Sequence, residues 1–168
     1  EIIYIHNYGG DHKVATVFDV ANYFISKASL DADSGSVMTH LKLQKLCYYA
    51  QAWSLAIYDT PLFQNEFEAW QHGPVCRELW DQLKDYKYNP ILEEIESNNI
   101  AFSEEEFDIL NQVWDIYGDL GAKTLENLTH SEEPWKVAWK DRPYGSMCNE
   151  VIPKSLMKAY YASQLKSE

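Results

Sequence analysis

The sequence lacks the features that mark several large classes of protein. Its 3 cysteines are odd in number and include no C-x-x-C pair, which excludes a disulfide framework and favours a reducing compartment. No apolar run reaches the roughly 18 residues of a transmembrane helix, and no signal-peptide pattern opens the chain. Lys and Arg number only 14 against 26 Asp and Glu, too few for non-specific binding to nucleic acid. We therefore expect a soluble, cytoplasmic protein that binds neither membranes nor nucleic acid through this domain.

Catalytic and cofactor motifs are missing as well. There is no glycine-rich phosphate loop, no H-E-x-x-H and no G-x-S-x-G. The five histidines, at positions 6, 12, 40, 72 and 130, lack the spacing of a metal site. His72 and Cys76 are separated by Gly73-Pro74, so helical spacing does not pair them as a nucleophile and base. We expect no enzyme, no metal and no cofactor, and keep a hydrolase that uses His72, His130 or Cys76 as an alternative.

What the sequence does contain is a large apolar and aromatic fraction. Apolar residues make up 46% and aromatic residues 14% of its 168 residues, which suits one globular domain with a substantial core. Most of the aromatic rings are expected to build the core, and a surface that binds a partner is the alternative for the surplus rings. The net charge of −12 is uneven, since residues 59–108 hold thirteen acids and three cations. This acidic middle either keeps the protein in solution or steers a basic partner toward it.

Residues 39–58 form the stretch around which the rest is organised. Apolar residues recur at steps of three and four from Leu43 to Ile57, and others widen the stripe almost around the helix. Thr39 is a suitable N-cap, and Pro61 excludes helix shortly after Tyr58. Because the helix is apolar on most sides, we expect its neighbours to enclose it. Its few polar residues are Lys42, Gln44, Lys45 and Gln51.

Start and stop signals divide the remainder into further helices. Capping-box patterns open helices at Thr16 with Asp19 and at Ser103 with Glu106, and Gly118 is expected as a C-terminal cap. Prolines are expected to start helices at positions 74, 134 and 153, and residues 120–130 form a shorter one. The fold class is therefore all-α (mainly α): a compact single-domain helical bundle around a buried central helix, with at most a small β element near residues 66–70. Residues 1–13 are a leader or linker, and the domain comprises residues 14–168.

Two stretches carry distinctive residues without a catalytic pattern. One is residues 70–75 (WQHGPV), and the other is residues 129–135 (THSEEPW), a helix end, a tight turn and a new helix anchored by Trp135. His130 satisfies buried backbone groups in one interpretation and acts at the surface in the other.

Further short motifs follow one another in order along residues 17–161: residues 18–24 (FDVANYF), 41–46 (LKLQKL), 48–53 (YYAQAW), 61–63 (PLF), 68–70 (EAW), 73–75 (GPV), 128–130 (LTH) and 134–135 (PW). Together they resemble the motifs of a known family, the Panacea antitoxin domain, also called SocA-like and often found in phage-associated proteins. His72 stands where a Tyr before Gly-Pro is more usual in that family, a departure that bears on local partner contacts.

The resemblance implies a mainly helical antitoxin of a toxin–antitoxin pair that neutralises a cognate protein toxin by direct binding. One relative instead delivers its toxin to a AAA+ protease, so the alternative is a phage-borne regulator or proteolytic adaptor that binds a host protein. Neither role uses a cofactor or a catalytic residue. The residues expected to bind the partner are Lys45, Tyr48, Trp70, His72, His130 and Trp135.

Overall fold

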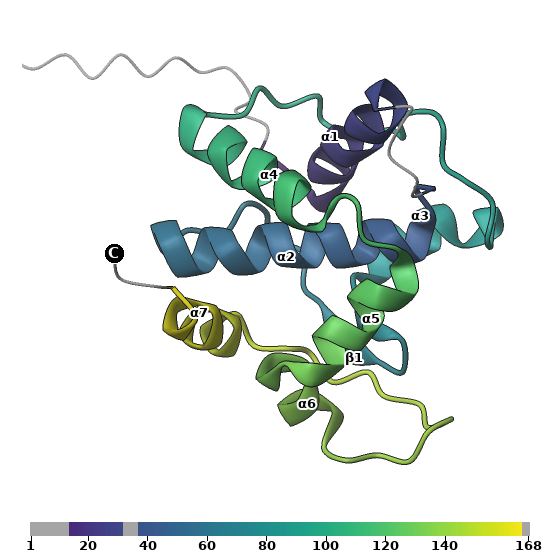
Figure 1. Cartoon of the computed structure of the whole chain (residues 1–168), viewed down its shortest axis with the longest axis vertical. Helices are drawn as coiled ribbons and strands as arrows, with labels where there is room; N and C mark the ends of the chain where they lie inside the picture. Colours follow the sequence, from purple (N-terminus) through teal and green to yellow (C-terminus); the bar gives the residue numbers. More distant parts are fainter. Residues whose placement is uncertain (1–13, 32–36, 166–168) are drawn as a thin grey trace, which may run out of the picture.

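The computed structural model describes residues 14–31 and 37–165. This part of the chain folds into seven α-helices and a single small β-hairpin, which confirms the predicted mainly-α fold (Figure 1). The elements are α1 (Val17–Leu30), α2 (His40–Tyr58), β1 (Glu68–Trp70), β2 (Gly73–Val75), α3 (Arg77–Leu83) with the 3₁₀ turn η1 (Lys84–Tyr86), α4 (Glu104–Tyr117), α5 (Ala122–Ser131), α6 (Glu133–Trp139) and α7 (Lys154–Ser163). The predicted leader, with His6 and His12, lies outside the described residues.

Helix α2 is the centre of the bundle. It contacts α1, α3, α4, α5, α7 and β2, and Figure 1 shows it crossing the middle of the molecule, with α1 and α4 on one side and α5 and α7 on the other. Leu43, Leu46 and Ala50 are fully buried, as the spacing predicts. The last turn of α2 is not enclosed: Ile57, expected on the buried stripe, is 41% exposed.

The glutamines of α2 are buried with the apolar residues and hold two connecting segments. The side-chain amide of Gln44 donates to Cys76 O at 3.1 Å, and its carbonyl oxygen accepts from Cys76 N at 2.9 Å. Gln51 likewise donates to Phe63 O at 2.8 Å and accepts from Leu62 N at 2.8 Å. Each glutamine thus satisfies backbone groups that would otherwise be buried without a partner.

The lysines of α2 are buried too, and both ammonium groups donate to backbone carbonyls. Lys42 Nζ donates to Gly118 O and Lys45 Nζ donates to Pro74 O at 3.2 Å. Burial of a charged amine is unfavourable unless such acceptors surround it. The polar residues of α2 therefore do not face solvent but attach the segments around the helix to it.

The local start signals are confirmed at two helices. Thr16 N donates to Asp19 Oδ2 at 2.8 Å at the start of α1. At α4 the Ser103 hydroxyl accepts from Glu106 N at 3.2 Å, while Ser103 N donates to the Glu106 carboxylate at 3.0 Å. Pro134 lies in the first turn of α6, and Pro153 is the N-cap of α7.

Two residues differ from their predicted roles. Pro74 does not start a helix but lies in β2, opposite Ala69, and α3 begins only at Arg77. Gly118 follows α4 in a right-handed conformation, with φ −60°, and not as a left-handed cap. Its lack of a side chain matters for space, since a Cβ there would lie 2.8 Å from Trp114 Cδ2.

The C-terminal third of the chain packs against the hairpin. Ala69 N donates to Glu150 O at 2.8 Å, and Ile152 N donates to Phe67 O at 2.7 Å. Residues 150–152 thus cover the edge of β1 that β2 leaves open, and they bring the preceding loop close to the hairpin.

Candidate functional site

An open groove lies between the hairpin, α3 and the loop that follows α6. Its cavity volume is about 550 Å³, and its walls are mostly apolar. We call it the tryptophan groove and define it by Leu41, Trp70, Gln71, His72, Val75, Arg77, Trp80 and residues 145–149.

Trp70, Trp80 and Arg77 form one wall of the tryptophan groove, and Lys84 lies beside it. The rings of Trp70 and Trp80 lie 5.4 Å apart at 59°. The Arg77 guanidinium carbon lies 5.3 Å from the Trp70 ring centre, and Lys84 Nζ lies 5.2 Å from that of Trp80. Cations over ring faces are attracted by the ring quadrupole, so these contacts stabilise the orientation of the indoles.

The charge of Arg77 is balanced within the groove. Its Nε and Nη2 donate to the two carboxylate oxygens of Glu68 at 3.1 and 3.0 Å, a bidentate pair. The hydrogen bond to Glu68 raises the pKa of Arg77. Arg77 also donates to Asn149 Oδ1 at 3.2 Å, which connects α3 to the loop on the other side of the groove.

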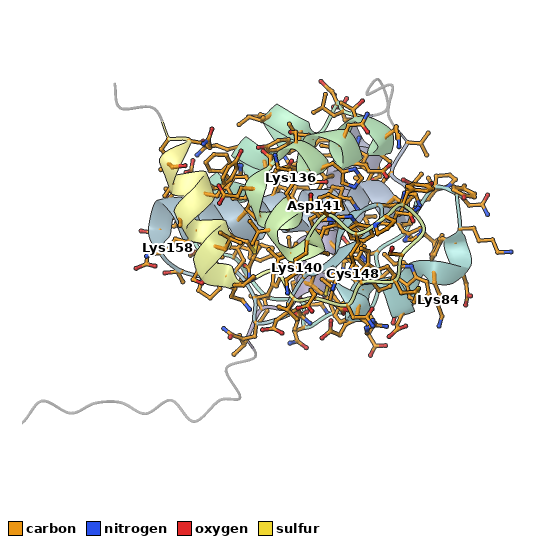
Figure 2. The ribbon with its side chains drawn as sticks, turned by 90° about the horizontal axis from the view of Figure 1, so that it is seen from below. Lys84, Lys136, Lys140, Asp141, Cys148 and Lys158 are labelled. Atoms are coloured by element: carbon orange, nitrogen blue, oxygen red, sulfur yellow. The ribbon has the colours of Figure 1, made fainter. Side chains whose placement is uncertain are left out.

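That loop closes the far edge. Gly145 N donates to Gln71 Oε1 at 2.6 Å, and Gly145 has φ +90°, a conformation that favours glycine. Met147 is 87% exposed at the rim, whereas Cys148 is buried behind it. Figure 2 shows Cys148 on the side of the molecule seen from below.

The floor beneath Trp70 is built by the turn between α5 and α6. Trp135 Nε1 donates to Trp70 O at 2.8 Å, and Trp135 is itself buried. The Trp135 ring stacks on Trp139 at 5.2 Å and 14°, and the His130 ring lies 4.1 Å away on another side. Burial lowers the pKa of His130, whose Nε2 has no hydrogen-bond partner among the described residues.

Beneath the hairpin turn, Lys45 packs tightly against Gly73. Gly73 has φ +101°, and a Cβ there would lie 2.6 Å from Lys45 Cε and 2.8 Å from Thr129 Oγ1. Burial lowers the pKa of Lys45 to about 8, and the nearby Glu126 carboxylate opposes this shift. The hairpin can approach α2 this closely only because position 73 has no side chain.

His72 and Glu126 are within hydrogen-bond distance of each other beside the turn. His72 Nδ1 lies 2.7 Å from Glu126 Oε1, and Lys123 Nζ donates to Glu126 Oε2 at 3.1 Å. Burial raises the pKa of Glu126, but the hydrogen bonds from His72 and Lys123 outweigh it and leave the pKa below its usual value. The His72 side chain remains 51% exposed, so it is available at the surface.

Tyr48 belongs to a separate buried network. The Tyr161 hydroxyl lies 3.2 Å from that of Tyr48 and 3.0 Å from Glu132 Oε1, which also accepts from Tyr49 at 2.6 Å. Burial raises the pKa of Glu132, and the hydrogen bonds from both tyrosines oppose this. Burial likewise raises the pKa of Tyr48 above its ordinary value.

Five of the six residues expected to bind a partner thus gather around the hairpin. His72 is exposed and Trp70 is half-buried, and both line the tryptophan groove. Lys45, Trp135 and Tyr48 are buried, and the expectation that they bind a partner stays a prediction. In the described structure these residues support the surface from within.

Sequence reasoning missed part of the groove. Trp80, Arg77 and Met147 were not among the residues expected to bind a partner. Trp80 lies three residues after Arg77 and ten after Trp70, a recurrence of large polarisable groups that could have marked a shared surface. The contribution of residues 145–149 has no local signal, because it depends on a contact across more than 70 residues.

The described residues hold no group of three or more His, Cys, Asp or Glu side chains placed to bind a metal ion. Within the same residues, none of the helices has the length and apolarity needed to cross a membrane.

Comparison with known proteins gives a family match. The model of the antitoxin SocA-like, Panacea domain matches residues 43–136, which include most of α2, the hairpin, α3, α4, α5 and Trp135. No curated protein and no solved structure matches the chain.

Proposed function

Because the chain belongs to the antitoxin SocA-like, Panacea domain family, we propose that it is the antitoxin of a toxin–antitoxin pair and neutralises a cognate protein toxin by direct binding. The family match is the observation that carries this proposal. The role needs a binding surface and assigns no catalytic residue, metal or cofactor to the chain. The cysteines Cys47, Cys76 and Cys148 are all free, which suits action in the reducing cytoplasm.

The tryptophan groove is the surface we assign to the toxin. Binding energy at protein interfaces concentrates in a few residues, among which Trp and Arg are over-represented. Trp70, Trp80 and Arg77 are three such residues on one wall, and the exposed Met147 adds an adaptable apolar side chain opposite them.

The groove is held in shape before a partner arrives. Trp70 is fixed by Trp135 through its backbone carbonyl and by Arg77 over its ring. Rigid side chains lose little conformational entropy on binding, so more of the contact energy appears as affinity. The buried Lys45 and Trp135 thereby contribute to binding without touching the toxin.

The toxin is held against the groove so that its active surface is covered. A net charge of −12 favours encounter with a basic protein, as expected for toxins that act on RNA or nucleotides. The charge accelerates the approach, and the tryptophan groove supplies the short-range contacts.

Coexpression with the product of the neighbouring open reading frame tests the proposal. We expect that product alone to arrest growth, and this chain to restore growth and to copurify with it. Trp80→Ala is expected to weaken binding by about 30-fold or more, the effect of losing an interfacial tryptophan. Tyr88→Ala is a matched control, since Tyr88 is an exposed aromatic residue outside the groove.

A harmless neighbour that never copurifies would contradict the antitoxin role. If a pull-down then recovered a host protein or a AAA+ protease, the regulator or adaptor alternative would replace it. Trp80→Phe keeps an aromatic ring at the position, and thermal melting of each variant separates lost binding from lost folding.

A further inference from the structure

A second apolar groove lies at the other end of α2. It runs between α2 and α4 to the end of the described chain at Leu165, with a cavity volume of about 170 Å³. We call it the acid-edged groove. Three aliphatic side chains at its mouth remain in solvent: Ile57 is 41%, Ile116 62% and Leu165 47% exposed. Figure 1 shows α4 alongside α2, with α7 on the opposite side of α2.

The segment that contains α4, one wall of this groove, carries a dense negative charge. Residues 88–122 contain nine Asp and Glu and no Lys or Arg, and five of these acids lie on α4. In the described part of the chain, no salt bridge involves Glu105 or Asp108. The charge of these two carboxylates is therefore available to another molecule.

Two of these acids lie on α4 beside the groove. Gln112 lines the groove, and its Nε2 donates to Asp108 Oδ2 at 2.8 Å. The Tyr58 hydroxyl, next to Ile57, lies 3.2 Å from Asp108 Oδ2. The carboxylates of Asp108 and Glu105 both raise the pKa of Tyr58, in addition to the effect of desolvation, so both are close to it. Asp108 therefore borders the apolar groove, and Glu105 lines the neighbouring cavity beside Tyr58.

The C-terminal part of the chain has a different charge balance. Residues 122–165 contain six Lys and Arg and five Asp and Glu. Lys136, Lys140 and Lys158 lie on the side seen from below in Figure 2. Lys158, one of the two lysines of α7, already pairs with Asp59 at 2.6 Å.

We propose that the acid-edged groove binds a basic amphipathic segment of another protein. An aliphatic side chain of the segment enters between Ile57, Ile116 and Leu165, and its Lys or Arg side chains face Glu105 and Asp108. Opposite charges around an apolar contact favour encounter and fix orientation. This proposal is independent of the antitoxin role, because it concerns a surface that role does not use.

Charge decides between this occupant and others. A symmetric dimer through the same face would place the acidic edges of two copies against each other, which is unfavourable. Nucleic acid and anionic lipid surfaces carry negative charge and would be repelled by the same carboxylates. A basic segment is the occupant that satisfies both the apolar mouth and its edge.

The two grooves are far enough apart for simultaneous use. Leu41 lines the tryptophan groove and Ile57 lines the acid-edged groove, and they are separated along α2 by roughly 24 Å at 1.5 Å per residue. One molecule can therefore bind a protein at each end of its central helix.

A labelled peptide of about 14 Leu and Lys residues, with Leu at helical spacing, tests the proposal by fluorescence anisotropy and amide chemical-shift mapping. We expect the shifts to centre on Ile57, Gln112 and Ile116 and to spare the Trp70 and Trp80 indoles. Ile116→Ser is expected to weaken binding about 10-fold, and the double variant Glu105→Gln, Asp108→Asn by a similar factor. The same peptide with Glu in place of Lys should not bind.

Matched controls lie on the opposite part of the molecule. Val137→Ser removes a similarly exposed aliphatic side chain from α6, and Asp141→Asn removes an exposed carboxylate. Both should leave peptide binding unchanged. Binding that is insensitive to Ile116→Ser would overturn the proposal. So would a wild-type dimer in sedimentation that Ile116→Ser dissociates, because a second copy would then be the occupant.

Discussion

The tryptophan groove and the acid-edged groove lie at opposite ends of one helix and differ in how their charges are balanced. In the first, Arg77 pairs with Glu68, and His72 and Lys123 pair with Glu126. In the second, Glu105 and Asp108 lie beside an apolar mouth without a described ion pair. The charges at the tryptophan groove are paired within the molecule, whereas the carboxylates at the acid-edged groove are left to pair with a cation of another molecule.

This difference separates two contributions to recognition. Paired charges and fixed rings provide a rigid, short-range surface whose strength depends little on ionic strength. Unpaired surface carboxylates act over several ångströms and lose influence as salt rises. The comparison can be tested by disturbing one groove at a time.

Gly73→Ala is expected to have the largest effect. The substitution forces a Cβ into the space of Lys45 and Thr129 and places alanine at φ +101°. We expect the free energy of unfolding to fall by about 3 kcal/mol, since strain and overpacking combine. Chemical denaturation followed by tryptophan fluorescence measures it. Below the unfolding transition, toxin binding should weaken while peptide binding at the acid-edged groove persists.

Gly121→Ala is the matched control for this substitution, because a Cβ at Gly121 meets nothing within 4 Å and its φ is −73°. Its effect should stay below about 1 kcal/mol. Equal losses at the two glycines would contradict the close packing described beneath the hairpin.

Lys45→Met is expected to change how stability depends on pH. Burial lowers the pKa of Lys45 to about 8 from the 10.5 of an exposed lysine, so above pH 8 the folded protein binds fewer protons than the unfolded chain. Unfolding then takes up a proton, and stability rises with pH. Between about pH 8 and 9.5, wild type should gain about 2 kcal/mol relative to Lys45→Met.

Denaturation of both proteins at several pH values measures this gain, and the shared tyrosines and cysteines cancel in the difference. Lys136→Met replaces an exposed lysine and serves as the control. A difference between wild type and Lys45→Met that does not vary with pH would show that the ammonium is not buried beneath the first groove.

The smallest expected effect is a difference between the two grooves in how strongly their binding affinity depends on salt concentration. Raising the salt concentration from about 0.05 to about 0.5 M should weaken the Leu–Lys peptide about 10-fold at the acid-edged groove. Equilibrium affinity at the tryptophan groove should change less than about 3-fold, since its charges are already paired. Titrations at matched pH measure both, and equal salt dependence would remove the distinction between the grooves.

Much of the fold follows from local signals in the sequence. The apolar spacing of α2, the capping boxes at Thr16 and Ser103 and the prolines at positions 134 and 153 act within one helix or turn, and the structure confirms them. Pro74 was placed wrongly because proline suits both the first turn of a helix and a strand whose N–H is not needed. Only its pairing with Ala69 decides between them.

The candidate site was predictable only in part for a related reason. Trp70 and His72 stand out in a short motif, whereas the loop at residues 145–149 reaches them through contacts distant in sequence. The burial of Lys45 was unexpected, since lysine is seldom enclosed without an acceptor. The Lys45 ammonium donates to a backbone carbonyl in another element. Every residue type has such a carbonyl, so the sequence does not indicate which one accepts the hydrogen bond.

Four buried polar side chains of α2, the two lysines and the two glutamines, have a consequence for how this architecture can diversify. These side chains form hydrogen bonds with backbone groups of the connecting segments: Lys42, Gln44, Lys45 and Gln51. The backbone N–H and C=O groups that they bind are present in nearly all amino acids. Outward-facing side chains on those segments can therefore be exchanged while the path of the chain is retained. Such a framework could acquire new specificities by surface mutation alone, much as a fixed scaffold carries interchangeable loops.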